Sequence, residues 1–150
     1  METYHRPSWD EYFLDVMHAL AKRATCDRGR TACVIVKDNQ IVVSGYVGSP
    51  PGLPHCDEVG HLMKKVVDED GTIREHCMRT IHAEQNAIIQ AGQDRCKNAV
   101  MYIYGHNFIC ILCKRFIIQA GIKEVFLQKD ENSELVHVTA EEIKRDLEQT

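Results

Sequence analysis

The chain has 150 residues, a formal net charge of −4 and a pI near 6.0, and 44% of its residues are apolar and 27% charged. A chain of this length can bury a substantial core, and we expect a single domain over residues 1–150. It has no long uncharged stretch, signal-type N-terminus or basic run. This composition argues against a membrane span, secretion and binding to polymeric nucleic acid, and it indicates a cytoplasmic protein.

The first predicted element is a helix from about Trp9 to Arg23. Ser8 and Glu11 have the spacing of a capping box, in which each side chain binds the other residue's backbone amide. Two β-branched runs, TACVIVK and QIVVSGY, follow and are joined through Asp38 and Asn39. This pattern predicts an antiparallel hairpin with a turn that tolerates left-handed backbone.

A long insertion is predicted from Ser49 to about Arg79. It begins with GSPPGLPH, whose prolines and glycines interrupt regular structure. We expect a loop there, with one short helix around Glu58 to Val67. A loop this long inside a compact domain is usually functional.

The pattern becomes regular again after the insertion. A helix is predicted from Thr80 to Ala91 and ends at Gly92, and a second runs from Cys110 to Ala120 and ends at Gly121. The strand AVMYIY precedes the second helix, the strand EVFLQ follows it, and a crossover of this kind makes the two strands parallel. With a terminal helix at Thr139 to Glu148, the order of elements predicts an α/β domain with a mixed sheet and helices on both faces.

A zinc site is predicted from residues at the starts of these two helices. Cys110 and Cys113 are three apart, which places both sulfurs on one helix face beside unpaired backbone amides that favour thiolates. His82 lies at the start of the preceding helix. A catalytic zinc ion takes three such ligands and leaves the fourth position to water. If the two helices pack on the same side of the sheet, their N-termini can meet around one ion.

Glu84 stands two residues after the histidine. Positions 82 and 84 are roughly 200° apart around a helix, so the carboxylate need not point at the ion and can stand beside its water. A carboxylate there can take a proton from the water and return it to a leaving amine, as in a hydrolytic deamination. Histidine and glutamate in this spacing, followed by C-x-x-C, are typical of zinc deaminases.

Two plainer interpretations of the cysteines remain open. The C-x-x-C pair could form a closed zinc site that only stabilises the fold, or the thiols could be small buried apolar groups. A purely structural site would not require Glu84 beside it, which favours the catalytic interpretation. Of the other cysteines, we expect Cys33 to lie in the core and Cys96 to be a loop thiol without a role.

TIHAEQNAI followed by CILC resembles the cytidine and deoxycytidylate deaminase superfamily, and SWDEYF, TCDR, VIVKD, GLPHCDE and IIQAGIKEV resemble its deoxycytidylate branch. The resemblance runs from about Pro7 to Leu127. It implies a three-layer α-β-α cytidine-deaminase-like fold with about five strands, hydrolysis of dCMP to dUMP and ammonia, and a homo-oligomer, either a dimer or a hexamer. The residues it implies are the zinc ligands His82, Cys110 and Cys113, the proton carrier Glu84, and the backbone near Ala83 facing the pyrimidine.

The sequence departs from the family pattern at several positions. Ile109 replaces the proline that usually precedes the first cysteine, and Val47 stands where an asparagine resembling a sugar-hydroxyl ligand is common. Tyr104, His106 and Asn107 could supply replacement contacts to base or phosphate. The departures leave open a deaminase of another base or nucleotide, and a non-catalytic nucleotide-binding protein that retains zinc.

A second group of metal-binding residue types flanks the insertion. It comprises Cys26, His55, Cys56, His76 and Cys77. A loop-rich segment with few apolar residues needs another way to hold its shape, and a structural zinc ion would provide one. Some deoxycytidylate deaminases resemble this arrangement, and we predict the three cysteines with His76 or His55 as ligands. The alternative is reduced cysteines packed under a loop.

Arg28 and Arg30 lie between the first helix and the first strand. Guanidinium groups at this point could bind a 5′-phosphate through paired hydrogen bonds. A solvated turn is the plainer alternative. Arg28 is the candidate that we include among the substrate-binding residues, together with Ala83, Val47, Tyr104 and His106.

Overall fold

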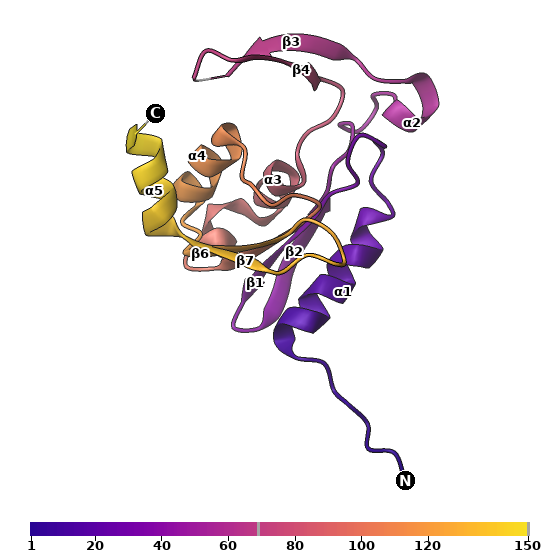
Figure 1. Ribbon diagram of the computed structural model, residues 1–150, viewed down its shortest axis with the longest axis vertical. Helices are drawn as coiled ribbons and strands as arrows, with labels where there is room; N and C mark the ends of the chain where they lie inside the picture. The colour runs from indigo at the N-terminus through magenta and orange to yellow at the C-terminus, as the bar shows by residue number, and fades with distance from the viewer. Residues whose placement is uncertain (69, 150) are drawn as a thin grey trace.

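A mixed sheet of five strands forms the centre of the computed structural model, which describes residues 1–68 and 70–149 (Figure 1). In chain order its strands are β1 (Ala32–Lys37), β2 (Gln40–Tyr46), β5 (Val100–Tyr104), β6 (Glu124–Gln128) and β7 (Val136–Thr139). They lie in the order β2-β1-β5-β6-β7. Strands β5 and β6 are parallel and the other pairs are antiparallel, which confirms the predicted mixed sheet.

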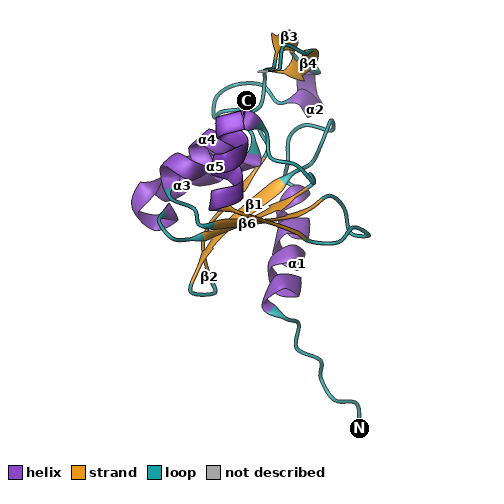
Figure 2. Ribbon diagram, turned by 60° about the vertical axis from the view of Figure 1, so that its left-hand side comes forward, coloured by secondary structure: helices purple, strands orange, loops and turns teal. Residues whose placement is uncertain are grey.

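Helices cover both faces of this sheet (Figure 2). Helix α1 (Trp9–Ala21) lies on one face, and α3 (Ala83–Cys96), α4 (Ile111–Ala120) and α5 (Ala140–Gln149) lie on the other. This is the predicted α-β-α arrangement. Of the helices in the described residues, none is long and apolar enough to cross a membrane.

The strand β1 shows why three layers form. Its side chains alternate, so that Val34 and Val36 pack with α1 while Cys33 and Ile35 pack with α3 and α4. All four side chains are buried. A strand that is apolar on both faces requires cover on both, and the helices provide it.

The ends of the first elements follow the local sequence. At the start of α1, the backbone amide of Glu11 donates to Ser8 Oγ at 3.2 Å and that of Ser8 donates to Glu11 Oε2 at 3.1 Å, which is the predicted capping box. In the β1–β2 turn, Asp38 and Asn39 have φ angles of 51° and 61°, so the turn is left-handed as expected.

The two later helices end at glycines. Gly121 closes α4 in the left-handed conformation, with φ of 85°. In α3 the regular helix is interrupted at Gly92, with φ of 75°, and a further helical segment continues to Cys96. The predicted end at Gly92 is therefore a kink, and the chain stays ordered beyond it.

The insertion contains more regular structure than the sequence predicted. It forms a short helix α2 (Cys56–Val59) and an antiparallel hairpin of β3 (Met63–Val67) and β4 (Ile73–Cys77), which lies apart from the central sheet (Figure 1). The predicted helix around Glu58 to Val67 is wrong over most of its length. The segment from Met63 pairs with β4 instead, which satisfies its backbone hydrogen bonds.

Candidate active site and second metal centre

The predicted zinc ligands His82, Cys110 and Cys113 come together at the N-termini of two packed helices. One ligand atom from each lies within 4.8 Å of the others, and His82 Nδ1 is 3.2 Å from Cys113 Sγ. His82 precedes α3, Cys110 precedes α4, and Cys113 lies in the first turn of α4. The donor set of one imidazole and two thiols matches a catalytic zinc site, which takes three protein ligands.

Local contacts hold the histidine in place. The backbone amide of Ile81 donates to the carbonyl of Gly48 at 3.0 Å, which attaches the start of α3 to the segment after β2. The backbone amide of His82 donates to Gln85 Oε1 at 3.0 Å. The backbone amide of this N-cap residue is thus satisfied by a side chain, and the imidazole ring contacts Cys113.

Protonation of the three ligands is strongly coupled. Hydrogen bonds from the thiol of Cys113 and from His82 lower the pKa of Cys110 to about 3, against the opposing effect of burial. The same contact raises the pKa of Cys113, and the hydrogen bond to Cys110 raises the pKa of His82. One sulfur is therefore a thiolate at neutral pH, which is the form that binds a metal ion.

Glu84 lies at the second position of α3 and is 3% exposed. Its Oε1 atom is buried and has no hydrogen-bond partner within the described chain. Buried carboxylate oxygens are rarely left without a partner, because their desolvation costs free energy. An unpaired oxygen at this point fits a carboxylate that serves a bound water or substrate, and it supports the predicted role.

A cavity of about 550 Å³ opens beside this cluster. Its walls come from the metal cluster, from the segments that precede β1 and follow β2, and from the β3–β4 hairpin. The lining residues that bear most directly on chemistry are Arg28, Val47, Arg74, His76, His82, Glu84, His106, Phe108 and Cys110. Its volume suits a small molecule of nucleotide size.

Of the predicted substrate-binding residues, Arg28, Val47 and His106 line this cavity. Ala83 is fully buried against β2, with its carbonyl oxygen 2.8 Å from the position that a Cβ on Gly45 would occupy. Tyr104 lies elsewhere, with its ring centroid 4.6 Å from that of His18 on the α1 face. Strand alternation explains this, because Tyr104 shares a sheet face with Tyr102 rather than with Ile103.

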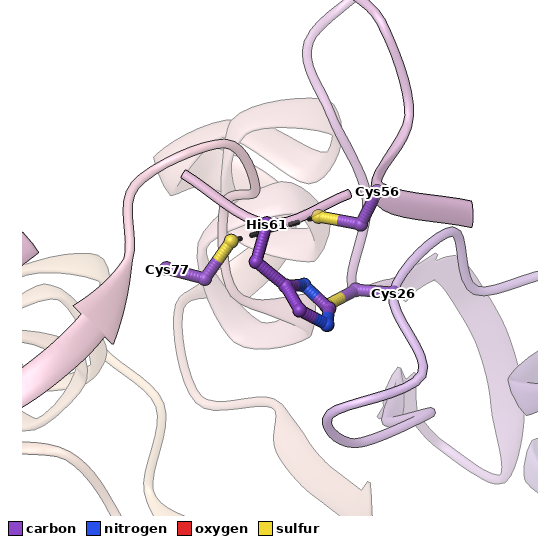
Figure 3. A group of neighbouring side chains, drawn as sticks. All are labelled: Cys26, Cys56, His61 and Cys77. Atoms are coloured by element: carbon purple, nitrogen blue, oxygen red, sulfur yellow. Dashed lines mark hydrogen bonds between the residues drawn. The ribbon is translucent and has the colours of Figure 1, made fainter. Parts of the chain in front are cut away.

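Figure 3 shows a second cluster, in which side chains of the insertion meet Cys26 from the segment that follows α1. Cys26, Cys56, His61 and Cys77 each offer a ligand atom, and these atoms lie within 4.8 Å of one another. Cys56 Sγ is 3.5 Å from Cys77 Sγ, and Cys26 Sγ is 3.5 Å from His61 Nδ1. The three cysteines are those predicted, and a set of three sulfurs and one nitrogen matches a closed structural zinc site.

The predicted fourth ligand is wrong, because the structure places His61 there and neither His76 nor His55. Neighbouring residues of a strand point to opposite faces, so Cys77 reaches the cluster and His76 turns away from it. The His76 ring lies 5.5 Å from that of His82. His61 lies between α2 and β3, and its Nε2 is 3.0 Å from Asp27 Oδ1, an arrangement that orients a ligating imidazole.

The cysteines of this cluster also share protons. Burial raises the pKa of Cys56 to about 12, with a further contribution from its hydrogen bond to Cys77. Burial acts in the same direction on Cys77, but the backbone amides of Arg79 and Leu62 donate hydrogen bonds to it and lower its pKa to about 7. Backbone amides directed at a sulfur are characteristic of thiolate ligands.

Comparison with known proteins identifies a zinc-binding family. Residues 7–129 match the family model described as the cytidine and deoxycytidylate deaminase zinc-binding region. The chain belongs to this family. Within the match lie both clusters and every residue named above as lining the cavity.

Curated relatives in this family cover most of the chain. ComE operon protein 2 of Bacillus subtilis is 39% identical over 94% of this chain and 74% of its own length. The deoxycytidylate deaminase of Mycobacterium phage D29 is 31% identical over 83% of this chain and 98% of its own. That of Schizosaccharomyces pombe is 38% identical over 80% of this chain, which spans only 37% of that larger relative.

Solved structures of the deaminase family share the fold. The dCMP deaminase of the cyanophage S-TIM5 in its apo form gives a TM-score of 0.62 at 19% identity, with 97% of this chain and 94% of that chain covered. The same enzyme in complex with dCMP and dUMP gives 0.58 at 22% identity over 83% of each chain. At these identities the comparison establishes the architecture.

Arg30 makes a structural contact that was not predicted from the sequence. Its guanidinium forms two hydrogen bonds of 3.0 Å with the carboxylate of Asp57 in α2, and it also donates to the carbonyl of Ala24. The guanidinium in turn lowers the pKa of Asp57. Arg30 therefore ties the insertion to the segment after α1, while Arg28 faces the cavity.

Several residues of the site were not predicted from the sequence. His61 lay inside a predicted helix, and the cavity walls formed by Arg74 and Phe108 come from segments treated as loops. Phe108 is 62% exposed, and its ring centroid lies 5.2 Å from that of His106. A single exposed apolar residue is common on protein surfaces, so the sequence carried no signal for Phe108.

Two cysteines have no place in either cluster. Cys33 is fully buried in β1, as predicted. Cys96 was predicted to be a loop thiol, and this is wrong, because it is fully buried at the end of α3. The helical segment beyond Gly92 carries Cys96 back into the core, where burial raises its pKa.

Proposed function

We propose that this chain is a zinc-dependent deaminase that hydrolyses dCMP to dUMP and ammonia. The observation that carries the proposal is the buried Glu84, whose unpaired oxygen stands in a cavity wall with two of the three residues of a catalytic zinc set. The curated relatives named deoxycytidylate deaminase, which match over most of this chain, support the same reaction.

His82, Cys110 and Cys113 would hold the zinc ion. When bound, the ion would acidify a water molecule and supply the hydroxide for attack on C4 of the pyrimidine. Glu84 would accept the proton released by that water and give it to N3 of the ring as the C4–O bond forms. It would then take the proton of the new C4 hydroxyl and give it to the amino group, so that ammonia leaves as the C–N bond breaks and the C4 carbonyl forms. Because Glu84 is buried, bulk water does not compete for these protons.

The nucleotide would lie with its base at the metal cluster and its phosphate toward Arg28. The guanidinium of Arg28 lines the cavity and can donate two hydrogen bonds to one phosphate. Val47 lines the same cavity and offers no side-chain hydrogen bond. Because Val47 cannot bind a sugar hydroxyl through its side chain, the second candidate function is deamination of another base or nucleotide.

Steady-state assays with dCMP, dCTP, cytidine and guanine test the substrate. We expect the highest kcat/KM with dCMP, with release of ammonia and formation of dUMP. A higher kcat/KM with any other substrate would replace dCMP as the assignment. Absence of turnover on all four by zinc-loaded protein, together with tight binding of dCMP, would favour a non-catalytic nucleotide-binding protein.

We also propose that Cys26, Cys56, His61 and Cys77 hold a second, structural zinc ion. With four protein ligands such a site leaves no open position for water, so it would stabilise the insertion without chemistry. Metal analysis should give about two zinc ions per chain for the wild type and about one for Cys56→Ser. Cys96→Ala, which removes a buried thiol outside both clusters, serves as the control and should keep both ions.

The proposal also covers the oligomeric state and the cellular location of the protein. We expect one deaminase domain over residues 1–150 that forms a homo-oligomer, a dimer or a hexamer, as the family resemblance implies. Light scattering on the zinc-loaded protein measures this directly. Its seven free cysteines suit the reducing cytoplasm, where thiols remain available to zinc.

A further inference from the structure

On the α1 side of the central sheet, strands β6 and β7 have no helix over them in the described part of the chain (Figure 2). Helix α1 packs against β1, β2 and β5, and the other helices of the sheet lie on the opposite face. On the uncovered part, Phe126 of β6 is half-buried, and His137, which pairs with it in β7, is exposed. A row of three rings, Tyr102, Phe126 and His137, therefore ends at the open edge of the sheet, and we call it the aromatic strip.

The rings of the aromatic strip are stacked on one another. The centroids of Tyr102 and Phe126 lie 5.0 Å apart with an interplanar angle of 17°, and those of Phe126 and His137 lie 4.4 Å apart with an angle of 14°. His137 Nε2 is 2.8 Å from Glu124 Oε2, which orients the imidazole. No further ring stacks on the outer side of His137 among the described residues, so this side can receive an aromatic ring or a guanidinium.

Residues 1–7, which we call the N-terminal arm, carry side chains of this kind. The arm is exposed and extends away from the body of the molecule (Figure 1). Tyr4 is 83% exposed, and Arg6 has no ion-pair partner among the described residues. Pro7 restricts its own φ angle and disfavours the helical conformation at Arg6, which keeps this part of the arm extended.

Carboxylates border the aromatic strip at both ends. Asp10 Oδ1 accepts a hydrogen bond of 2.6 Å from the hydroxyl of Tyr102 at one end, and Glu124 contacts His137 at the other. The guanidinium of Arg6 is therefore complementary in charge to the borders of the strip. A nucleic acid or another polyanion would meet like charge at both ends.

The arm leaves the molecule beside the strip, because it joins the start of α1. There the ring of Trp9 stacks on that of Phe13 at 5.9 Å, and the Phe13 ring lies 5.0 Å from that of Tyr102. Seven extended residues span about 23 Å, whereas neighbouring strands are about 4.8 Å apart, so an arm is long enough to cross from β5 to β7. Two copies related by a twofold axis can therefore exchange arms, each covering the strip of the other.

We propose that the N-terminal arm of one copy lies on the aromatic strip of a second copy, with its Tyr4 ring on His137 and its Arg6 guanidinium paired with Glu124. The exchange buries the exposed Tyr4 ring and covers the open part of the sheet. This inference rests on the homo-oligomer of the proposed function, to which it assigns an interface, and it does not require the deaminase reaction.

Photo-crosslinking tests the contact directly. Benzoylphenylalanine introduced in place of Tyr4 should crosslink to the peptide that carries Phe126 and His137. Unlabelled and isotope-labelled protein are mixed and re-equilibrated first, so that mass spectrometry shows whether the two joined peptides come from different copies. Benzoylphenylalanine in place of Val67, which is 71% exposed in the β3–β4 hairpin, is the control and should not label this peptide.

Analytical ultracentrifugation tests the contribution of the arm to assembly. Tyr4→Ala combined with Arg6→Ala should raise the dissociation constant of the assembly at least about 10-fold, because aromatic and arginine side chains dominate the energetics of interfaces. Both side chains are exposed in a single copy, so the fold should stay intact, as circular dichroism can verify. Val67→Ala removes an exposed apolar side chain outside the strip and should change the dissociation constant less than about threefold.

The receiving surface is tested by a separate variant. His137→Ala removes an exposed ring from the edge strand without opening the core, and it should weaken assembly in the same direction as the arm variant. Combining the arm and strip changes should weaken assembly by less than the product of their separate effects, because both remove the same contact. Fully multiplicative effects would show that Tyr4 and Arg6 bind elsewhere.

The outcomes separate this inference from the proposed function. Crosslinks confined to one copy, or an unchanged dissociation constant in the arm variant, would refute the arm exchange and leave the homo-oligomer standing. Wild-type protein that stays monomeric would refute both. No residue of the arm or the strip is among those that line the catalytic cavity, so failure to deaminate dCMP by an arm-exchanged assembly would refute the deaminase assignment alone.

Discussion

At the scale of single residues, the position of Glu84 separates this site from a structural zinc centre. The carboxylate is buried in the first turn of α3, two residues after the predicted metal ligand His82, and one of its oxygens has no partner in the described chain. A fold under selection for stability alone would gain nothing from a desolvated carboxylate of this kind. The proton transfer that we propose for Glu84 would give this carboxylate a function.

Replacing Glu84 by Gln should therefore abolish most activity without removing the metal. We expect kcat for dCMP to fall by about 10²- to 10⁴-fold, because general acid-base catalysis typically contributes that much. Glu141→Gln, on the exposed side of α5, is the matched control. A fall of less than about threefold, with zinc content unchanged, would contradict the assigned role.

Gly45 controls the position of Glu84 through close packing. A Cβ at this position would lie 2.8 Å from the carbonyl oxygen of Ala83 and 2.9 Å from the backbone amide of Ala87, both in α3. These are backbone atoms, so the helix that carries Glu84 would have to move. The absence of a side chain in β2 thus sets how near α3 lies to the sheet.

Gly45→Ala should lower the free energy of unfolding by about 1–3 kcal/mol, the usual cost of overpacking. Urea denaturation of zinc-loaded protein measures this change. Gly29→Ala is the control, since its added Cβ would meet no atom closer than 3.9 Å, and its stability should remain within about 0.5 kcal/mol of the wild type. Equal stability of the two variants would show that α3 can shift freely.

At the scale of elements, we expect the β3–β4 hairpin to depend on metal binding at the second cluster. It is a two-stranded sheet outside the central five strands, and such a hairpin alone is marginally stable in water. Val67 and Ile73 at its far end are 71% and 66% exposed, so apolar packing contributes little there. Its base is held where Cys77 joins the cluster.

Removing metal should loosen this hairpin before the central sheet. Hydrogen exchange in the presence of a chelator should show loss of protection in β3 and β4, while β1 and β5 remain protected. Cys56→Ser should show the same local loss without chelator. Simultaneous loss of protection in the hairpin and the central sheet would mean that the metal stabilises the whole domain as one unit.

At the scale of the whole molecule, the core and the metal clusters divide the seven cysteines. Cys33 and Cys96 are fully buried and belong to neither cluster, and burial raises the pKa of both thiols. The other five belong to the two clusters. Thiolates react and thiols do not, so the two groups should differ sharply toward an alkylating reagent.

Thiol counting tests this division. Zinc-loaded native protein should react slowly at all positions, and a chelator should make the five cluster cysteines reactive. Cys33 and Cys96 should react only after unfolding, and mass spectrometry of labelled peptides identifies them. Labelling of Cys96 in native protein would instead support the exposed loop thiol that the sequence suggested.

The sequence alone indicated which residues form the first cluster, His82, Cys110 and Cys113 with Glu84 beside them, because their directions at the two helix starts are set by local backbone geometry. Only the packing of α3 on α4 brings the two helix starts together. The capping box of α1 and the left-handed β1–β2 turn were predictable from local backbone geometry as well. The capping box and the turn each depend on residues fewer than five apart, and the structure contains both.

Only the tertiary structure decided the fourth ligand of the second cluster, the sheet face of Tyr104 and the burial of Cys96. Each depends on which strand pairs with which, or on where a helix continues after a kink. His61 replaces His76 because β3 and β4 form a hairpin that turns His76 toward His82. Side-chain direction in a strand changes with every residue, so a site assembled from distant segments requires the register that long-range pairing provides.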